Sequence, residues 1–311
     1  MPAHPTTTVP APLDKLVQRR VKVLARYLPH ALEGVSEAIH EARVASRRVS
    51  EALPIVSSEL DRQVARKAKR GLQRVRRVLG PVRDLDVSLL ALDEFAQHGR
   101  APAEAAALVR HHMEQARADR RAVMCHVLRG ARIKRLITRL GAVVDQLRPD
   151  SESASASWVP RLSARLGTCA QRLRDAIEEA GALYVPERLH AIRIVGKKLR
   201  YALEFTDETR LVSTRRLITT LKGAQDHLGR FHDLAILMRA VNETEAALGA
   251  RVARRLGMND LKKLLDTECR ACHAHYVRHH AELIHLADTV TDRFVPQLND
   301  RAMAPRTHEL V

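Results

Sequence analysis

Two segments of the sequence place a histidine and two cations at the same helical spacing. In each segment a cation follows the histidine by three residues, and another follows four residues later. These residues are His40, Arg43 and Arg47 in the first segment and, 150 residues further on, His190, Arg193 and Lys197 in the second. Such intervals put side chains on one face of an α-helix, so each set forms a stripe about 10 Å long.

The chemistry that suits these residues is the binding of a linear anion. Arginine offers a bidentate fork to phosphate oxygens, and lysine offers a mobile point charge. A polyanion nearby would favour the protonated form of each histidine, which adds charge as the pH falls. Further cations lie beside the stripes: Arg48, Lys198 and Arg200. A single basic stripe is more often a solvated surface, but two stripes at matched positions favour a shared ligand.

A second basic segment has no acidic residue between Asp61 and Asp84. Four of its arginines recur at helical spacing: Arg66, Arg70, Arg74 and Arg77. Like charges four residues apart destabilise a helix, so a bound polyanion would offset the repulsion, although water and counterions could do the same. The matching part of the second half keeps fewer cations, among them Lys222. We therefore predict a binding surface that is more basic in the first half.

The composition indicates a basic protein without a membrane span. The chain has 53 Lys and Arg against 36 Asp and Glu, a formal net charge of +17. Such an excess attracts nucleic acid, anionic membranes or polyphosphate. No run of about 18 apolar residues, no secretory signal and no disulfide-like cysteine spacing occur. We therefore expect a cytoplasmic protein with reduced thiols that does not enter a membrane.

Apolar residues recur at helical spacing and strand-like alternation is absent, which predicts an all-α fold. Short connections between successive helices favour antiparallel bundles. A second repeated phrase supports an internal duplication, because LGPVRDLDV begins at Leu79 and LGRFHDLAI begins at Leu228. We predict two antiparallel four-helix bundles, the first at 13–150 and the second at 158–300. A flexible linker at 151–157 joins them, and the chain has a tail at each end, at 1–12 and 301–311.

Prolines and glycines predict where the helices end. We expect Pro29 to interrupt the first helix near its end, Pro54 to end the helix that carries His40, and Gly80-Pro81 to separate two helices. In the second half, Gly229 is expected to separate two more. The elements expected from these breaks include helices at 58–79, 82–97, 211–228 and 231–248, and long helical segments at 102–147 and 251–290. Gly130 and Gly141 allow local bends in the first of these long segments.

Two motifs have residues that could ligate a metal, and neither is expected to do so. Cys269, Cys272 and His273 match the letters of a c-type haem attachment site, and a zinc site on this helix face is geometrically conceivable. The plainer interpretation is two thiols packed within a helical bundle. Asp84 and Asp86 suggest a carboxylate pair, but only Asp84 has a counterpart in the second half, so we interpret it as the partner of nearby cations. We expect no resident metal or cofactor.

No pattern typical of catalysis is present, since the sequence lacks a Gly-rich phosphate loop, a nucleophile elbow and a metalloprotease helix. We therefore expect a binding protein and no enzyme, with a polyphosphate hydrolase or kinase as a third possibility. A nucleic-acid-binding module is the main alternative. Single-strand binders use aromatic platforms, and this chain has only one Trp, four Tyr and four Phe, which favours a ligand without bases.

Four phrases resemble the CHAD family, the conserved histidine α-helical domain: HEARVASRRVSEAL, LGPVRDLDV, HAIRIVGKKLRYALEF and LKGAQDHLGRFHDL. The resemblance spans about residues 13–300. It implies two four-helix bundles related by a pseudo-twofold axis, inorganic polyphosphate bound along a basic central channel, and association with polyphosphate granules. The sequence differs from the family pattern at His232, where the family more often has a small polar residue. The family's binding positions carry over to His40, Arg43, Arg47, Arg48, His190, Arg193, Lys197, Lys198, Arg200 and Lys222, and we add Arg66, Arg70, Arg74 and Arg77 from the basic segment.

Overall fold

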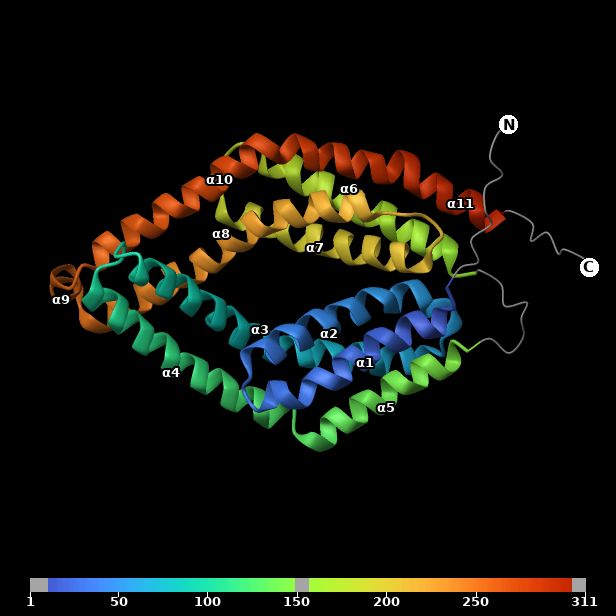
Figure 1. The fold of residues 1–311 in the computed structure, drawn as a ribbon, viewed down its shortest axis with the longest axis horizontal. Helices are drawn as coiled ribbons and strands as arrows, with labels where there is room; N and C mark the ends of the chain where they lie inside the picture. Colours follow the sequence, from blue (N-terminus) through green and yellow to red (C-terminus); the bar gives the residue numbers. More distant parts are fainter. Residues whose placement is uncertain (1–10, 149–156, 304–311) are drawn as a thin grey trace, which may run out of the picture.

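The structure is a computed structural model that describes residues 11–148 and 157–303 (Figure 1). Within these ranges the regular elements are helices and no strand occurs, which confirms the all-α prediction. None of the helices described is long and apolar enough to cross a membrane. Most of the predicted tails at 1–12 and 301–311 and of the linker at 151–157 lies outside the described residues.

The first half contains α1 (Leu13–Leu32), α2 (Ser36–Val56), a 3-10 turn η1 (Ser57–Glu59), α3 (Arg62–Gln97), α4 (Ala103–Val127) and α5 (Gly130–Gln146). The second half contains α6 (Val159–Ala180), α7 (Pro186–Thr209), α8 (Arg215–Leu248), α9 (Ala250–Arg255), α10 (Met258–Thr289), a π-helical turn η2 (Val290–Phe294) and α11 (Val295–Met303).

The two halves repeat the same order of packing. In the first half α1 packs on α2 and α2 packs on α3, and in the second half α6 packs on α7 and α7 packs on α8. The halves meet through equivalent helices, because α2 contacts α7 and α3 contacts α8 (Figure 1). The exact pseudo-twofold relation stays a prediction. This packing puts the two histidine helices, α2 and α7, against each other at the centre.

Apolar stripes explain why these segments form helices that pack. In α1, for example, Leu16, Val17, Leu24 and Leu28 fall on one face and are fully or almost fully buried. Burying each such side chain stabilises the fold by about 1.5–3 kcal/mol. The core formed in this way is rich in Leu, Val and Ala, as the low aromatic content of the sequence requires.

The helix boundaries predicted at prolines were wrong. Pro29, Pro54 and Pro81 lie inside α1, α2 and α3, so the two helices expected around Pro81 are one continuous helix. A proline within a helix costs about 3 kcal/mol, but Leu79 and Val82 on either side of Pro81 are completely buried, and their packing outweighs that cost. Likewise, α8 continues through the break expected at Gly229.

The two long helical segments, in contrast, are divided. The segment expected at 102–147 breaks between α4 and α5, and the one expected at 251–290 breaks between α9 and α10. At the second break Gly257 has a φ of +82°, and a Cβ there would come within 2.7 Å of Pro102. Only glycine fits that turn without strain, because it tolerates positive φ and has no side chain.

Candidate functional site

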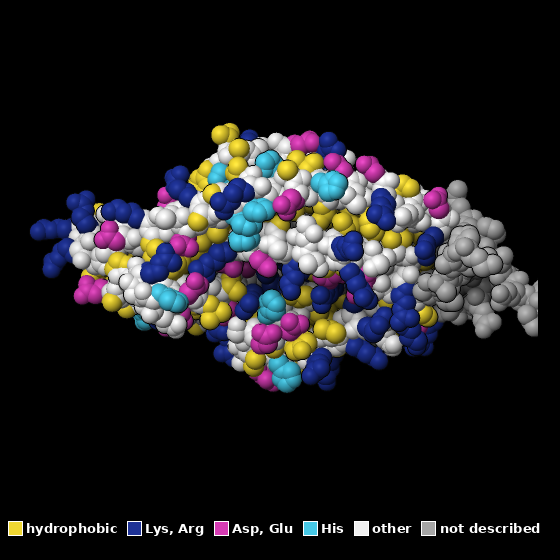
Figure 2. All heavy atoms as spheres, turned by 45° about the horizontal axis from the view of Figure 1, so that its top comes forward, with side chains coloured by type: hydrophobic (Ala, Val, Ile, Leu, Met, Phe, Trp, Pro, Cys, Tyr) yellow, Lys and Arg dark blue, Asp and Glu magenta, His cyan; other side chains and the backbone are white. Residues whose placement is uncertain are grey.

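Four predicted cations meet where α2 contacts α7, and we call them the central cation cluster. They are Arg43 and Arg47 of α2 and Arg193 and Lys197 of α7. The pKa of Lys197 indicates that the four side chains are close to one another. Burial lowers this pKa most, the charges of Arg193, Arg47 and Arg43 lower it further, and together they bring it to about 6. Tertiary packing therefore brings together cations that lie 150 residues apart in the sequence. Figure 2 shows Lys and Arg side chains, with carboxylates among them, in the recess between the halves.

The cluster is only partly exposed, and this burial strengthens the repulsion between its charges. Arg193 is 6% exposed, and the Arg43 side chain is 15% exposed. Burial, and then the charge of Arg47, lowers the pKa of Arg43 to about 10. Within the described residues the Arg193 Nε donor has no hydrogen-bond partner. An unsatisfied buried donor of this kind is suited to an anion that supplies the missing acceptor.

Two carboxylates at matched positions offset part of the charge. Arg43 donates a hydrogen bond to Asp84 of α3 at 3.0 Å, which is the structural role that the sequence suggested for Asp84. Asp233 of α8 is the counterpart near Arg193, and burial raises the pKa of its carboxyl. Two carboxylates beside four cations leave the cluster with net positive charge when Lys197 is protonated.

The two histidines of the repeated phrase have different surroundings. His190 lies beside His232, with 3.2 Å between their Nδ1 atoms, so one of the two rings donates its N–H to the other. Burial, and then Arg193, lowers the pKa of both rings, that of His232 to about 3. For His40, burial and then Arg83 lower the pKa. In the free protein these rings are therefore neutral at pH 7.

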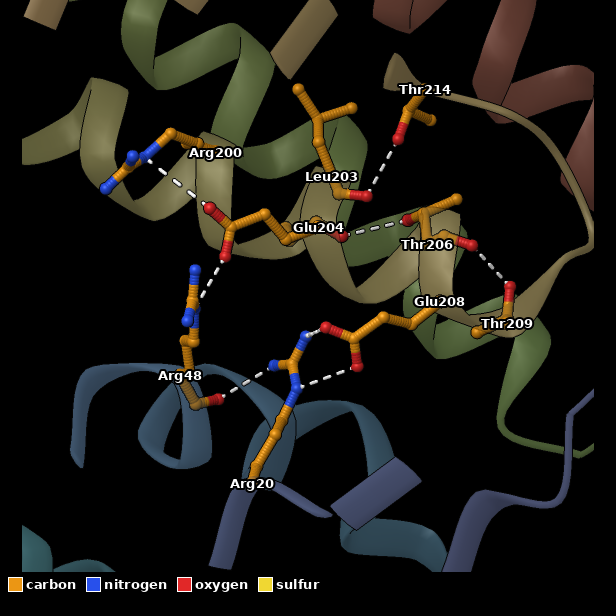
Figure 3. Close-up of polar contacts among 10 residues, drawn as sticks. Arg20, Arg48, Arg200, Leu203, Glu204, Thr206, Glu208, Thr209 and Thr214 are labelled. Atoms are coloured by element: carbon orange, nitrogen blue, oxygen red, sulfur yellow. Dashed lines mark hydrogen bonds and ion pairs between the residues drawn. The ribbon is translucent and has the colours of Figure 1, made fainter. Parts of the chain in front are cut away.

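Arg48 and Arg200 flank the cluster and share a carboxylate, Glu204 of α7 (Figure 3). The Nε atom of Arg48 donates to Glu204 at 2.8 Å, and the Nε atom of Arg200 lies 3.8 Å from its other oxygen. Next to them Arg20 of α1 makes a bidentate pair with Glu208 at 3.0 and 3.2 Å. The Arg48–Glu204 and Arg20–Glu208 pairs join the halves, whereas the Arg200–Glu204 pair lies within α7. Arg48 therefore has a structural role between the halves in addition to any contact with a ligand.

The other predicted site residues lie outside the cluster. Lys198 faces α6, where its charge acts on the Cys169 thiol, and Lys222 is exposed on α8. Arg66 and Arg70 are exposed on α3, whereas Arg74 and Arg77 line a separate pocket with α4 and α5. Whether any of these residues binds polyphosphate stays a prediction.

Two residues near the cluster were not predicted from the sequence. Arg76 of α3 lies close enough to Arg47 for that charge to lower its pKa, second only to burial. Arg76 is seven residues before Arg83, which acts on His40, so both lie on one face of α3. This spacing was a usable signal, but the helix break expected at Pro81 concealed it. The other residue is Gln225 of α8, whose amide nitrogen would lie 3.6 Å from a Cβ on Gly196, the residue before Lys197. Gln225 is buried, and its amide oxygen and nitrogen have no hydrogen-bond partner in the described structure.

The cysteine motif packs as the plainer interpretation predicted. Cys269 and Cys272 are free thiols, and burial raises the pKa of Cys269, to about 11, and that of Cys272. A hydrogen bond with Tyr184 also involves Cys269. In the described parts of the chain no group of three or more His, Cys, Asp or Glu side chains is arranged to hold a metal ion.

Comparison with known proteins identifies the family. A family model of the CHAD domain matches residues 15–242, which is well over half of the chain. The fold is similar to the crystal structure of the CHAD domain from the plant Ricinus communis, with a TM-score of 0.62 and 19% identity over 93% of this chain and 94% of that one. It is also similar to PptA from Streptomyces chartreusis, with a TM-score of 0.61 and 20% identity over 89% and 98% of the two chains. No curated protein matches the sequence. The chain belongs to the CHAD domain family.

Proposed function

We propose that this protein binds inorganic polyphosphate across the contact between α2 and α7, without hydrolysing it. The observation that carries the proposal is the central cation cluster, in which four basic side chains from both halves, three of them arginines, face only two nearby carboxylates. Holding buried like charges together costs free energy that a bound anion would recover. Membership of the CHAD family, which is associated with polyphosphate, supports the same ligand.

A linear polyanion suits this cluster better than a compact one. The cations follow two helices, so they offer contacts at intervals along a chain, and Arg76 extends the row onto α3. Repeated phosphate groups can each accept hydrogen bonds from an arginine fork. We further propose that such contacts would let the protein associate with polyphosphate granules. Release of phosphate from polyphosphate by the purified protein with Mg²⁺ would contradict a purely binding role.

A competition titration tests the choice of ligand. Labelled long-chain polyphosphate is bound at physiological salt and then challenged with single-stranded DNA or RNA at equal phosphate concentration. We expect polyphosphate to stay bound, because the chain has only one Trp, four Tyr and four Phe on which bases could stack. Unlabelled polyphosphate is the positive control and must displace the label. Displacement by nucleic acid at equal phosphate concentration would favour a nucleic-acid-binding module instead.

Binding is also expected to take up a proton near neutral pH. Lys197 has a pKa of about 6 in the free protein, so at pH 7.5 its amine is mostly neutral. A bound phosphate chain would raise the pKa of Lys197, so the complex holds more protons than the free protein and free polyphosphate do. The affinity therefore increases as the pH falls from 8 to 6. Calorimetry in two buffers of different ionisation enthalpy measures the uptake at pH 7.5.

Lys197→Arg is the matched variant for this measurement. An arginine keeps its charge at pH 7.5, so the variant should bind polyphosphate with most of the proton uptake lost. The neutral histidines account for any uptake that remains. Equal proton uptake by the variant and the wild type would show that Lys197 does not face the ligand.

A further inference from the structure

A second basic surface lies in the first half of the molecule. A pocket of about 790 Å³ is formed between α3, α4 and α5. Six arginines from these three helices line it: Arg74, Arg77, Arg120, Arg132, Arg135 and Arg139. No carboxylate is among the lining residues, and within residues 11–148 and 157–303 none of the six arginines forms an ion pair. The pocket is therefore a concentration of positive charge without an internal counter-charge.

The pocket forms where two stretches without acidic residues pack against each other. Residues 62–83 contain nine Lys and Arg, residues 120–144 contain seven, and neither stretch contains Asp or Glu. The packing is close, because a Cβ placed on Gly71 of α3 would come within 2.6 Å of Leu136 of α5. Apolar burial thus brings α3 and α5 together despite the repulsion between their arginines. An anion in the pocket would relieve that repulsion.

This pocket is distinct from the central cation cluster. Arg74 and Arg76 are two residues apart and so point about 160° away from each other around α3. Arg76 lies near Arg47, on the side of α2, whereas Arg74 lines the pocket with α4 and α5. All three helices of the pocket belong to the first half, which explains part of the charge difference between the halves: 28 basic and 16 acidic residues in 1–150 against 25 and 20 in 151–311.

We propose that this pocket is a second anion site, which binds a compact ligand carrying a short run of phosphate groups. Its volume lies within the range of small-molecule sites, about 300–1,000 Å³. Several arginine forks in one small space match several adjacent phosphates. Apolar side chains line the rest of the pocket: Val78, Pro81, Val123 and Val127. Both a short inorganic polyphosphate and a nucleoside triphosphate have this chemistry. The proposal goes beyond the function proposed for the central cation cluster and does not depend on it.

The test is a calorimetric titration with two probes, tripolyphosphate and ATP. The pocket variant is Arg135→Glu/Arg139→Glu on α5. The control is Arg251→Glu/Arg254→Glu on α9, which reverses two exposed arginines and changes the net charge equally. A second comparison is Arg47→Glu/Lys197→Glu, which alters only the central cation cluster. Circular dichroism checks the fold, and the neutral pair Arg135→Gln/Arg139→Gln replaces the pocket variant if the reversal unfolds it.

We expect the pocket variant to bind at least one probe tenfold or more weakly than the wild type. The control should stay within threefold of the wild type, and the central variant should keep a site for that probe. Tight binding of tripolyphosphate alone identifies an inorganic chain as the ligand class, and binding of ATP identifies a nucleotide. The proposal is overturned if the wild type binds neither probe, or if the pocket variant binds both as tightly as the α9 control does.

Discussion

Replacing Arg47 and Lys197 with glutamate is expected to weaken polyphosphate binding by at least about 100-fold while the helical fold is retained. Both side chains belong to the central cation cluster, and each would make a charge-assisted hydrogen bond to a phosphate. Such a bond contributes about 1.5–3 kcal/mol, and each 1.4 kcal/mol is a tenfold change in affinity. Losing two of them therefore costs about two to four orders of magnitude. Fluorescence anisotropy with labelled polyphosphate measures the change.

The fold should survive this reversal because the two residues face cations. Arg47 acts on Arg43, Arg76 and Arg193, and the charges that lower the pKa of Lys197 are those of arginines. Lys197 also acts on Asp233, but less strongly than Arg193 does. New carboxylates there would attract their neighbours, so we expect an unchanged or higher melting temperature. Reversing Arg43 or Arg193 would be a poorer test, since each would place a carboxylate beside Asp84 or Asp233.

The control for this experiment is the α9 variant Arg251→Glu/Arg254→Glu, which alters the net charge by the same amount far from α2 and α7. It should bind polyphosphate within about threefold of the wild type, because charges separated by more than a Debye length of about 8–10 Å are screened. Equal losses in both variants would mean that overall charge, and no particular site, holds the ligand.

A steep dependence on salt is the second large effect expected. Five cations, Arg43, Arg47, Arg76, Arg193 and Lys197, would displace counterions from the chain. With about 0.7 counterions released per contact on a flexible polyanion, the logarithm of affinity should fall with a slope of about −3.5 against the logarithm of salt concentration. Raising the salt from 50 to 200 mM should then weaken binding about 100-fold. Titrations at four salt concentrations give the slope.

The double variant supplies an internal check on this slope. Without Arg47 and Lys197 the slope should become shallower, about −2, because two contacts no longer release counterions. A wild-type slope shallower than about −1 would contradict a mainly electrostatic site. A slope that is the same in both proteins would show that the two side chains make no contact with phosphate.

The sequence predicted correctly the features that follow from spacing and repetition along the chain. The duplication places His40 and His190, Arg43 and Arg193, and Asp84 and Asp233 at equivalent positions, and the structure finds the arginines beside those carboxylates in both halves. Spacing of three and four residues identified which side chains share a helix face, because an α-helix imposes that period on any sequence. The helical class and the family followed from the same patterns.

The predictions failed where a local preference competed with packing. Pro81 was expected to end a helix, but α3 continues because the apolar residues around it are buried. That error separated Arg76 from Arg83 and hid the face of α3 that turns toward α2. The stripe through Arg74 and Arg77 was real, yet these two line a different pocket. A helical stripe shows which residues point together and leaves the direction in which they point undetermined.

The sequence by itself therefore determined an all-helical, duplicated, basic chain and the cations that recur in each copy. Only the tertiary structure decided which of those cations meet: it joined Arg43 and Arg47 to Arg193 and Lys197, and it paired Arg48 with Glu204. The physical reason is that periodicity and charge are set by neighbours along the chain. The rotation of each helix, in contrast, is set by which apolar faces pack best between distant segments, and the cations follow that rotation.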